Sequence, residues 1–239
     1  MVLNTRLVFT ILLAVLIGIV LLFIADVASQ DEVMTFREHM HGHLDEVSAV
    51  KAGVVAGDLD AARLPATWLA EHEEPPGMPE AWAPYVEELR RHARVAADAA
   101  DLEMAAVAVS EIARTCGECH RATGFDVAFG YDQRPPAEVQ NLTTQMQRHL
   151  WAADRMWDAL IGPSDNAWRW GTEMLAEVKL SPEQFGGDTK AQAAMERLSE
   201  LGRQGSLVTS GPARAGLYGE FLAQCAACHG VTGGGPGNY

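Results

Sequence analysis

Two copies of one residue pattern occupy most of this 239-residue chain. Each copy starts with a Met-x-x-His-Leu segment, Met40–Leu44 in the first and Met146–Leu150 in the second, and ends with a Cys-x-x-Cys-His motif. The interval from the His of the segment to the first Cys of the motif is 73 residues in one copy and 76 in the other. Such self-similarity predicts two copies of one structural unit.

The unit is expected to be helical throughout, which makes the fold class all-α. Apolar residues recur at three- and four-residue intervals, as in the stretch 102–113, and alternating β-type stretches are absent. Asp58 is expected to cap a helix, and Pro65 is expected to kink it. Helices are predicted at 31–57, 58–72, 82–98 and 101–120 in the first copy and at 136–161, 165–178, 189–204 and 212–229 in the second.

Two four-helix bundles in tandem are the simplest architecture for these eight helices. The first bundle is predicted to span residues 29–133 and the second residues 134–239. The segment Asp132–Pro136 is the predicted linker, because its two adjacent prolines cannot continue a helix.

The N-terminal residues 1–28 are predicted to form a single membrane anchor. Leu7–Ala25 is an uninterrupted apolar run that approaches the roughly 30 Å needed to cross a bilayer as a helix. Arg6 precedes the run and acidic residues follow it, an arrangement that exports the remainder of the chain. A cleaved signal peptide is the alternative, with Val27–Ser29 as the cleavage site. Either interpretation places the helical units outside the cytoplasm, and the anchor places them on the periplasmic side of a bacterial inner membrane.

The two Cys-x-x-Cys-His motifs predict two covalently attached haem c groups. Thiols three residues apart on a helix share a face and can reach the two vinyl groups of one porphyrin, and the adjacent His can then bind the iron. Zinc modules of paired Cys-x-x-Cys motifs separate the pairs by about 15–20 residues, much less than here, and no βαβ context for a redox dithiol is visible. The residues expected to bind haem are Cys116, Cys119 and His120 in the first motif and Cys225, Cys228 and His229 in the second.

The opposite side of each iron is expected to face the Met-x-x-His-Leu segment. His43 and His149 fall at matching positions of the repeat, and imidazole is a strong iron ligand. Met40 and Met146 lie three residues earlier, on the same helix face, and are the alternative sixth ligands. A third interpretation leaves the iron five-coordinate, with both residue types lining the pocket.

Arginine side chains also occur on these first helices. Arg37, Arg148 and Arg155 could pair with haem propionates, but a solvated helix face is the expected environment.

The net charge and the positions of the cysteines exclude some classes of function. The net charge is −14, which argues against nucleic-acid binding and fits an acidic surface that meets a basic partner. All four cysteines lie in the two motifs, so none remains for a disulfide framework. We therefore expect an electron carrier, not an enzyme, that exchanges electrons with a donor and an acceptor protein, one of them a membrane complex. A haem-based gas sensor and a haem-bearing subunit of a larger respiratory or photosynthetic complex are the alternatives.

A four-helix bundle with Cys-x-x-Cys-His on its last helix resembles the cytochrome c′ family and its low-spin relatives. The stretches Trp170–Glu173 and Lys179–Gly186 are similar to the segment that leads into the third helix of that family. The resemblance implies that the first helix supplies the residue over the open face of the haem, apolar in gas-binding members and Met in low-spin members. Met40 matches that position slightly better than His43 does. Tandem duplication and a membrane anchor depart from the family pattern, so gas binding is not carried over.

Overall fold

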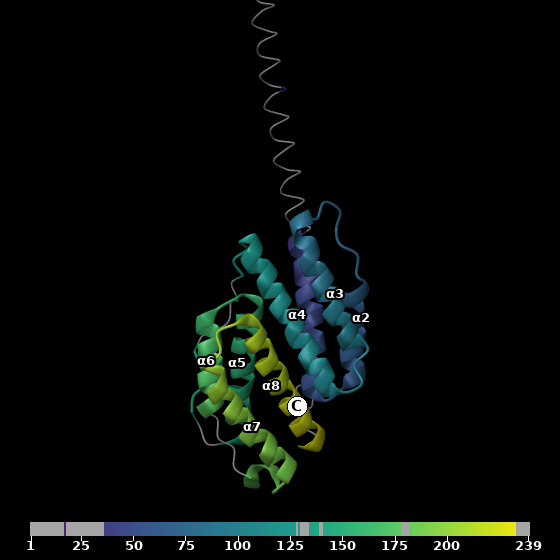
Figure 1. Ribbon diagram of the computed structural model, residues 1–239. Coiled ribbons are helices and arrows are strands. Elements are labelled where there is room, and N and C mark those ends of the chain that lie inside the picture. Colours follow the sequence, from purple (N-terminus) through teal and green to yellow (C-terminus); the bar gives the residue numbers. More distant parts are fainter. Residues whose placement is uncertain are drawn as a thin grey trace, which may run out of the picture. The chain divides into compact units, whose positions relative to one another are not determined.

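The computed structural model describes residues 17, 36–127, 129, 134–138, 141–177 and 182–232. These residues form α-helices and two short 3-10 helices, and no strand occurs among them, which confirms the all-α prediction (Figure 1). A first helix covers residues 36–56. It is followed in the first copy by α2 (Leu59–Glu71), η1 (Glu80–Trp82), α3 (Ala83–Ala97) and α4 (Leu102–Thr123), and in the second copy by α5 (Leu142–Ile161), α6 (Asp165–Glu177), η2 (Pro182–Phe185), α7 (Thr189–Gly205) and α8 (Gly211–Thr232).

Local signals set most of the helix bounds. Asp58, Asp101 and Asn141 accept hydrogen bonds from the backbone N–H three residues on, at 2.8–2.9 Å, and so cap α2, α4 and α5. Gly124 ends α4 in the left-handed conformation, with φ 76°. Pro65 lies inside α2, and the helix continues through it. The helix bounds therefore follow from residues close to each end.

Three predicted ends were wrong by a few residues. Residues 136–138 are not helical, and α5 begins only after the Asn141 cap, because the prolines before it favour extended backbone. Helices α4 and α8 each continue three residues past the Cys-x-x-Cys-His motif: α4 ends at Thr123, before Gly124, and α8 continues through Gly230 to Thr232. Both motifs therefore lie inside regular helix.

Contacts divide the chain into a unit of residues 1–44 and a unit of residues 45–239. Within the second unit, α5 packs on α6, α6 on α7, α7 on α8, and α8 back on α5, which closes a four-helix group. In the first copy α2 packs on α3 and α3 on α4. A Cβ built on Gly53 would lie 2.6 Å from the backbone nitrogen of Ala62, so residues 45–56 lie directly against α2.

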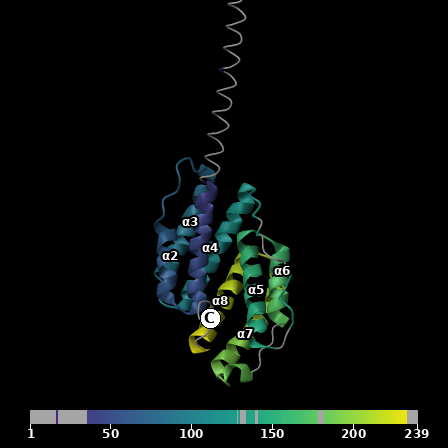
Figure 2. The same cartoon turned by 180° about the vertical axis from the view of Figure 1, so that it is seen from behind.

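The two copies meet through their motif helices. Helix α4 packs extensively on α8 and also on α5, and α4 and α8 lie side by side in both views (Figures 1 and 2). Gly211, at the start of α8, lies beside Arg114 near the end of α4, whereas Gly219 lies beside Val107, earlier in α4. The two helices are therefore antiparallel, and their motifs lie toward opposite ends of the contact.

Large apolar side chains fill the interior of the 45–239 unit. Trp168, Tyr218 and Phe221 are at most 2 % exposed, and small alanines line the facing helices. The ring of Tyr218 lies 5.8 Å from that of Trp157 and 5.5 Å from that of Phe221, measured between centroids. Burial of this aromatic group supplies much of the apolar area that holds α5 against α8.

None of the helices in the described ranges is long and apolar enough to cross a membrane. Apart from Ile17, the run Leu7–Ala25 lies outside the described residues, as do residues 31–35 at the start of the predicted helix 31–57. The linker prediction falls partly outside them as well, because Asp132 and Gln133 are not described. The anchor and the boundary between residues 133 and 134 stay predictions.

Candidate haem-attachment sites

The first motif lies in the last two turns of α4. Cys116 and Cys119 are free cysteines, three residues apart on one helix face. Burial raises the pKa of the Cys116 thiol to about 12, and burial also raises the pKa of Cys119. Both thiols are therefore protonated at neutral pH, unlike the lowered-pKa thiolate of a reactive dithiol.

The second motif repeats this arrangement in α8. Cys225 and Cys228 are free, and burial raises the pKa of Cys225 to about 12 and raises that of Cys228. Burial is therefore the largest influence on the thiol pKa values in both motifs, although the smaller influences differ: Thr123 lowers the pKa of Cys119, and Asp188 raises that of Cys228.

Each motif histidine is held by a backbone carbonyl of the other copy. His120 Nδ1 lies 2.8 Å from the carbonyl oxygen of Ile161, and His229 Nδ1 lies 2.7 Å from that of Val55. A carbonyl can only accept, so Nδ1 carries the proton in both rings. The Nε2 atom of each ring then keeps its lone pair, which is the form that binds a metal.

His149 lies close to His229. The Nε2 atom of His149 is shielded from solvent and has no hydrogen-bond partner among the described residues. Burial, together with a smaller electrostatic contribution from His229, lowers the pKa of His149 to about 4. The predicted proximal and distal histidines of the second copy are therefore near enough to interact electrostatically, and a buried ring nitrogen of His149 has no hydrogen-bond partner among the described residues.

The distal candidates of the first copy belong to the unit of residues 1–44. His43 is buried, at 7 % exposure, and its ring lies 4.3 Å from that of His39, one turn earlier on the same helix. Met40 is half-buried, and so is its counterpart Met146 in the second copy. The placement of His43 and Met40 relative to His120 stays a prediction. Sequence reasoning missed His39, although its four-residue spacing from His43 was visible.

The expectation of a solvated face was wrong for two of the three arginines. Arg37 is exposed, but Arg148 and Arg155 are 6 % and 3 % exposed. Arg155 Nη2 lies 2.6 Å from Asp158 Oδ2, and its guanidinium lies 5.8 Å from the ring centroid of Trp151. The indole Nε1 of Trp151 is also buried without a hydrogen-bond partner among the described residues. Helix α5 therefore carries buried donors on the turns after His149.

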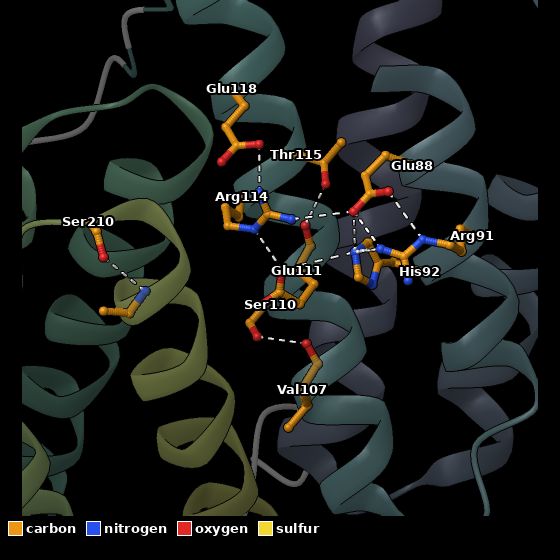
Figure 3. Close-up of polar contacts among 11 residues, drawn as sticks. Glu88, Arg91, His92, Val107, Ser110, Glu111, Arg114, Thr115, Glu118 and Ser210 are labelled. Atoms are coloured by element: carbon orange, nitrogen blue, oxygen red, sulfur yellow. Dashed lines mark hydrogen bonds and ion pairs between the residues drawn. The ribbon is translucent and has the colours of Figure 1, made fainter. Parts of the chain in front are cut away.

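A charged network fixes α4 to α3 just before the first motif (Figure 3). Arg114 Nε lies 2.6 Å from Glu111, and Arg114 Nη1 lies 2.6 Å from Glu118, the residue between Gly117 and Cys119. Glu88 on α3 lies 3.5 Å from Arg114 and 3.0 Å from His92. The arginine thus ties a motif residue to the neighbouring helix.

Comparison with known proteins does not assign this arrangement to a group: no family model, curated protein or solved structure matches the chain.

Proposed function

We propose that this protein is a membrane-anchored c-type cytochrome that carries two covalently bound haems and transfers electrons on the periplasmic side of a bacterial inner membrane. The haems would be carried by two tandem four-helix bundles, one for each copy of the repeat. The net charge of −14 suits a basic redox partner, which the acidic surface would attract at low ionic strength.

The observation that carries the proposal is the pair of histidines in the second copy. A buried nitrogen lone pair without a partner costs free energy, about 1–3 kcal/mol for a neutral group. His149 Nε2 is a buried nitrogen without a hydrogen-bond partner among the described residues, and the ring of His229, which affects the pKa of His149, has its Nδ1–H committed to a carbonyl. His149 and His229 could therefore both hold a haem iron, which would satisfy the two Nε2 atoms.

The residues of the two motifs fit a covalently attached haem. Cys116 and Cys119 would form thioethers to one porphyrin and His120 would bind its iron, while the second haem would be held in the same way (by Cys225, Cys228 and His229). His149 would be the sixth ligand of the second iron and His43 that of the first, with Met146 and Met40 as the alternatives. The Trp151 N–H and the Arg155 guanidinium are suitable donors for propionates.

Haem would supply one-electron chemistry, and the protein would set the reduction potential of each haem. Burial, axial ligands and the hydrogen bonds to those ligands determine the reduction potential. A reactive dithiol explains the motifs less well, because burial holds all four thiols in the protonated form. A zinc site that uses both cysteine pairs is also disfavoured, since the pairs lie toward opposite ends of the contact between α4 and α8. Two histidines on the second iron would also leave no open position for a gas.

Haem stoichiometry tests the proposal. The full chain, produced in a host that attaches haem c, should give two haems per chain by pyridine haemochrome absorption and should retain them on a denaturing gel. Replacing both cysteines of either motif by serine should leave one haem. A chain that carries no covalent haem, or that carries zinc in its place, would refute the proposal.

Substitution of the distal residues tests the ligand set. In the native holoprotein His149→Leu should convert one of the two haems from low spin to high spin, seen in absorption and electron paramagnetic resonance spectra. Met146→Leu is the matched control, one turn earlier on α5, and should leave both haems low spin. The opposite result would assign the sixth position to Met146.

A further inference from the structure

Each motif histidine donates its Nδ1–H to a backbone carbonyl oxygen in the other copy of the repeat. Ile161 follows His149 by twelve residues, and Val55 follows His43 by twelve residues, so the two acceptor carbonyls are equivalent positions of the repeat. The two hydrogen bonds, 2.8 Å and 2.7 Å long, therefore form a reciprocal pair related by approximate twofold symmetry. Nothing in the sequence pattern requires this exchange.

The acceptor carbonyls are well suited to this role. The last four carbonyls of a helix have no partner within the helix, and they lie at the negative end of the helix dipole. Ile161 is the last residue of α5, and Val55 is the penultimate residue of the 36–56 helix. Donation of Nδ1–H to such an oxygen fixes the ring orientation and makes Nε2 a stronger donor to a metal.

Glycine at position 117 makes the first of these contacts possible. A Cβ built on Gly117 would overlap the carbonyl oxygen of Leu160 and lie 3.4 Å from that of Ile161. Both atoms are backbone at the end of α5, so neither can move without moving the helix. Any side chain at position 117 would therefore push α4 away from the carbonyl that holds His120.

The second contact does not depend on a glycine in the motif. The residue equivalent to Gly117 is Ala226, which is buried in α8 at 3 % exposure. It faces Gly57, just after the 36–56 helix, whose φ of +76° favours glycine. A Cβ on Gly57 would lie at an ordinary contact distance, 3.7 Å, from the carbonyl oxygen of Ala226. The two contacts are thus built differently, although their hydrogen bonds are equivalent.

We infer that the copies of the repeat complete each other's haem sites: the Ile161 carbonyl and Gly117 position His120, and the Val55 carbonyl positions His229. This inference rests on the proposed function, because it concerns histidines that bind haem iron. Its consequence is that the reduction potential of each haem is set in part by the other copy. Loss of the hydrogen bond to His120 makes the imidazole a weaker donor, which favours the ferrous state and raises the potential of the first haem alone.

The test is Gly117→Ala in the full-length holoprotein. A spectroscopic redox titration should show one of the two components shifted to higher potential and the other unchanged. The Cys225→Ser/Cys228→Ser variant, which keeps only the first haem, assigns the component that moves. Gly230→Ala is the matched control, because it lies next to His229 but a Cβ there meets nothing within 4 Å, and it should leave both components in place. An unchanged titration of Gly117→Ala, or an equal shift of both components, would overturn the inference.

A measurement on the unmodified protein keeps the inference testable if Gly117→Ala does not fold. In the reduced holoprotein, nuclear magnetic resonance should show the Nδ1–H of His120 exchanging with solvent at least tenfold more slowly than that of an exposed histidine. It should also show a nuclear Overhauser effect from this proton to Ile161 or Gly162. Fast exchange and no such effect would refute the cross-copy hydrogen bond while the two haems remain attached. Absence of covalent haem in the same sample would instead refute the proposed function.

Discussion

Replacing Trp168 by Phe removes one buried hydrogen bond and one ring of the indole from the second copy. Trp168 lies on α6 and is 2 % exposed, and its Nε1–H donates to the carbonyl oxygen of Gly205 at 2.8 Å. Gly205 is the last residue of α7, and its carbonyl oxygen also accepts a longer hydrogen bond, 3.3 Å, from the backbone N–H of Val208. The indole also lies 5.3 Å from the guanidinium of Arg214, a contact that a phenyl ring can keep.

The free energy of unfolding should fall by about 1.5–2.5 kcal/mol in this variant. The hydrogen bond contributes about 0.5–1.5 kcal/mol, because the carbonyl keeps only its longer bond from Val208. The missing second ring leaves a small cavity, which adds about 1 kcal/mol. For a domain of 150–250 residues, 1 kcal/mol corresponds to roughly 2–4 °C in Tm, so a fall of about 3–10 °C is expected.

Urea denaturation followed by circular dichroism at 222 nm measures this loss. Trp170→Phe is the matched control, since it makes the same replacement on the same helix at a half-buried position, and it should change the unfolding free energy by less than about 1 kcal/mol. Equal losses of unfolding free energy in Trp168→Phe and Trp170→Phe would show that the hydrogen bond to Gly205 does not stabilise the packing of α6 on α7.

Two further predictions concern a buried carboxyl group and a close helix contact. Burial raises the pKa of Asp158 from 3.8 to about 7, more than the neighbouring Arg155 lowers it. The folded state then keeps a proton that the unfolded state releases, so the free energy of unfolding should fall by about 2 kcal/mol between pH 5 and pH 7. Asp158→Asn should remove this part of the pH dependence. If the free energy of unfolding, measured by urea denaturation, changed with pH in the same way in the original protein and in Asp158→Asn, the raised pKa of Asp158 would be refuted. Gly202→Ala should destabilise the protein by about 1–3 kcal/mol, because its Cβ would overlap the backbone nitrogen of Ala176 on α6. Gly216→Ala, where a Cβ meets open space, should leave the stability unchanged or raise it. Thermal melts of both glycine variants measure these effects.

The sequence by itself determined the helices and the chemistry of the two motifs. Helical hydrogen bonds join residues four apart and caps act within three residues, so Asp58 and Asp101 mark helix starts without reference to the rest of the chain. The spacing of Cys116, Cys119 and His120 on one helix face follows from the same local geometry. The predicted start of α5 was wrong by a few residues, and its true start at Leu142 is also set by residues close to that helix end.

Only the tertiary structure decided which carbonyl holds each motif histidine and which polar side chains are buried. His120 and Ile161 are 41 residues apart, and His229 and Val55 are 174 apart. Periodicity identifies the apolar face of a helix but not the helix that covers it, so the burial of Arg155 could not be foreseen. The reason is physical: α4 reaches the end of α5 because Gly117 leaves space there, and that space exists only once the two copies have packed together.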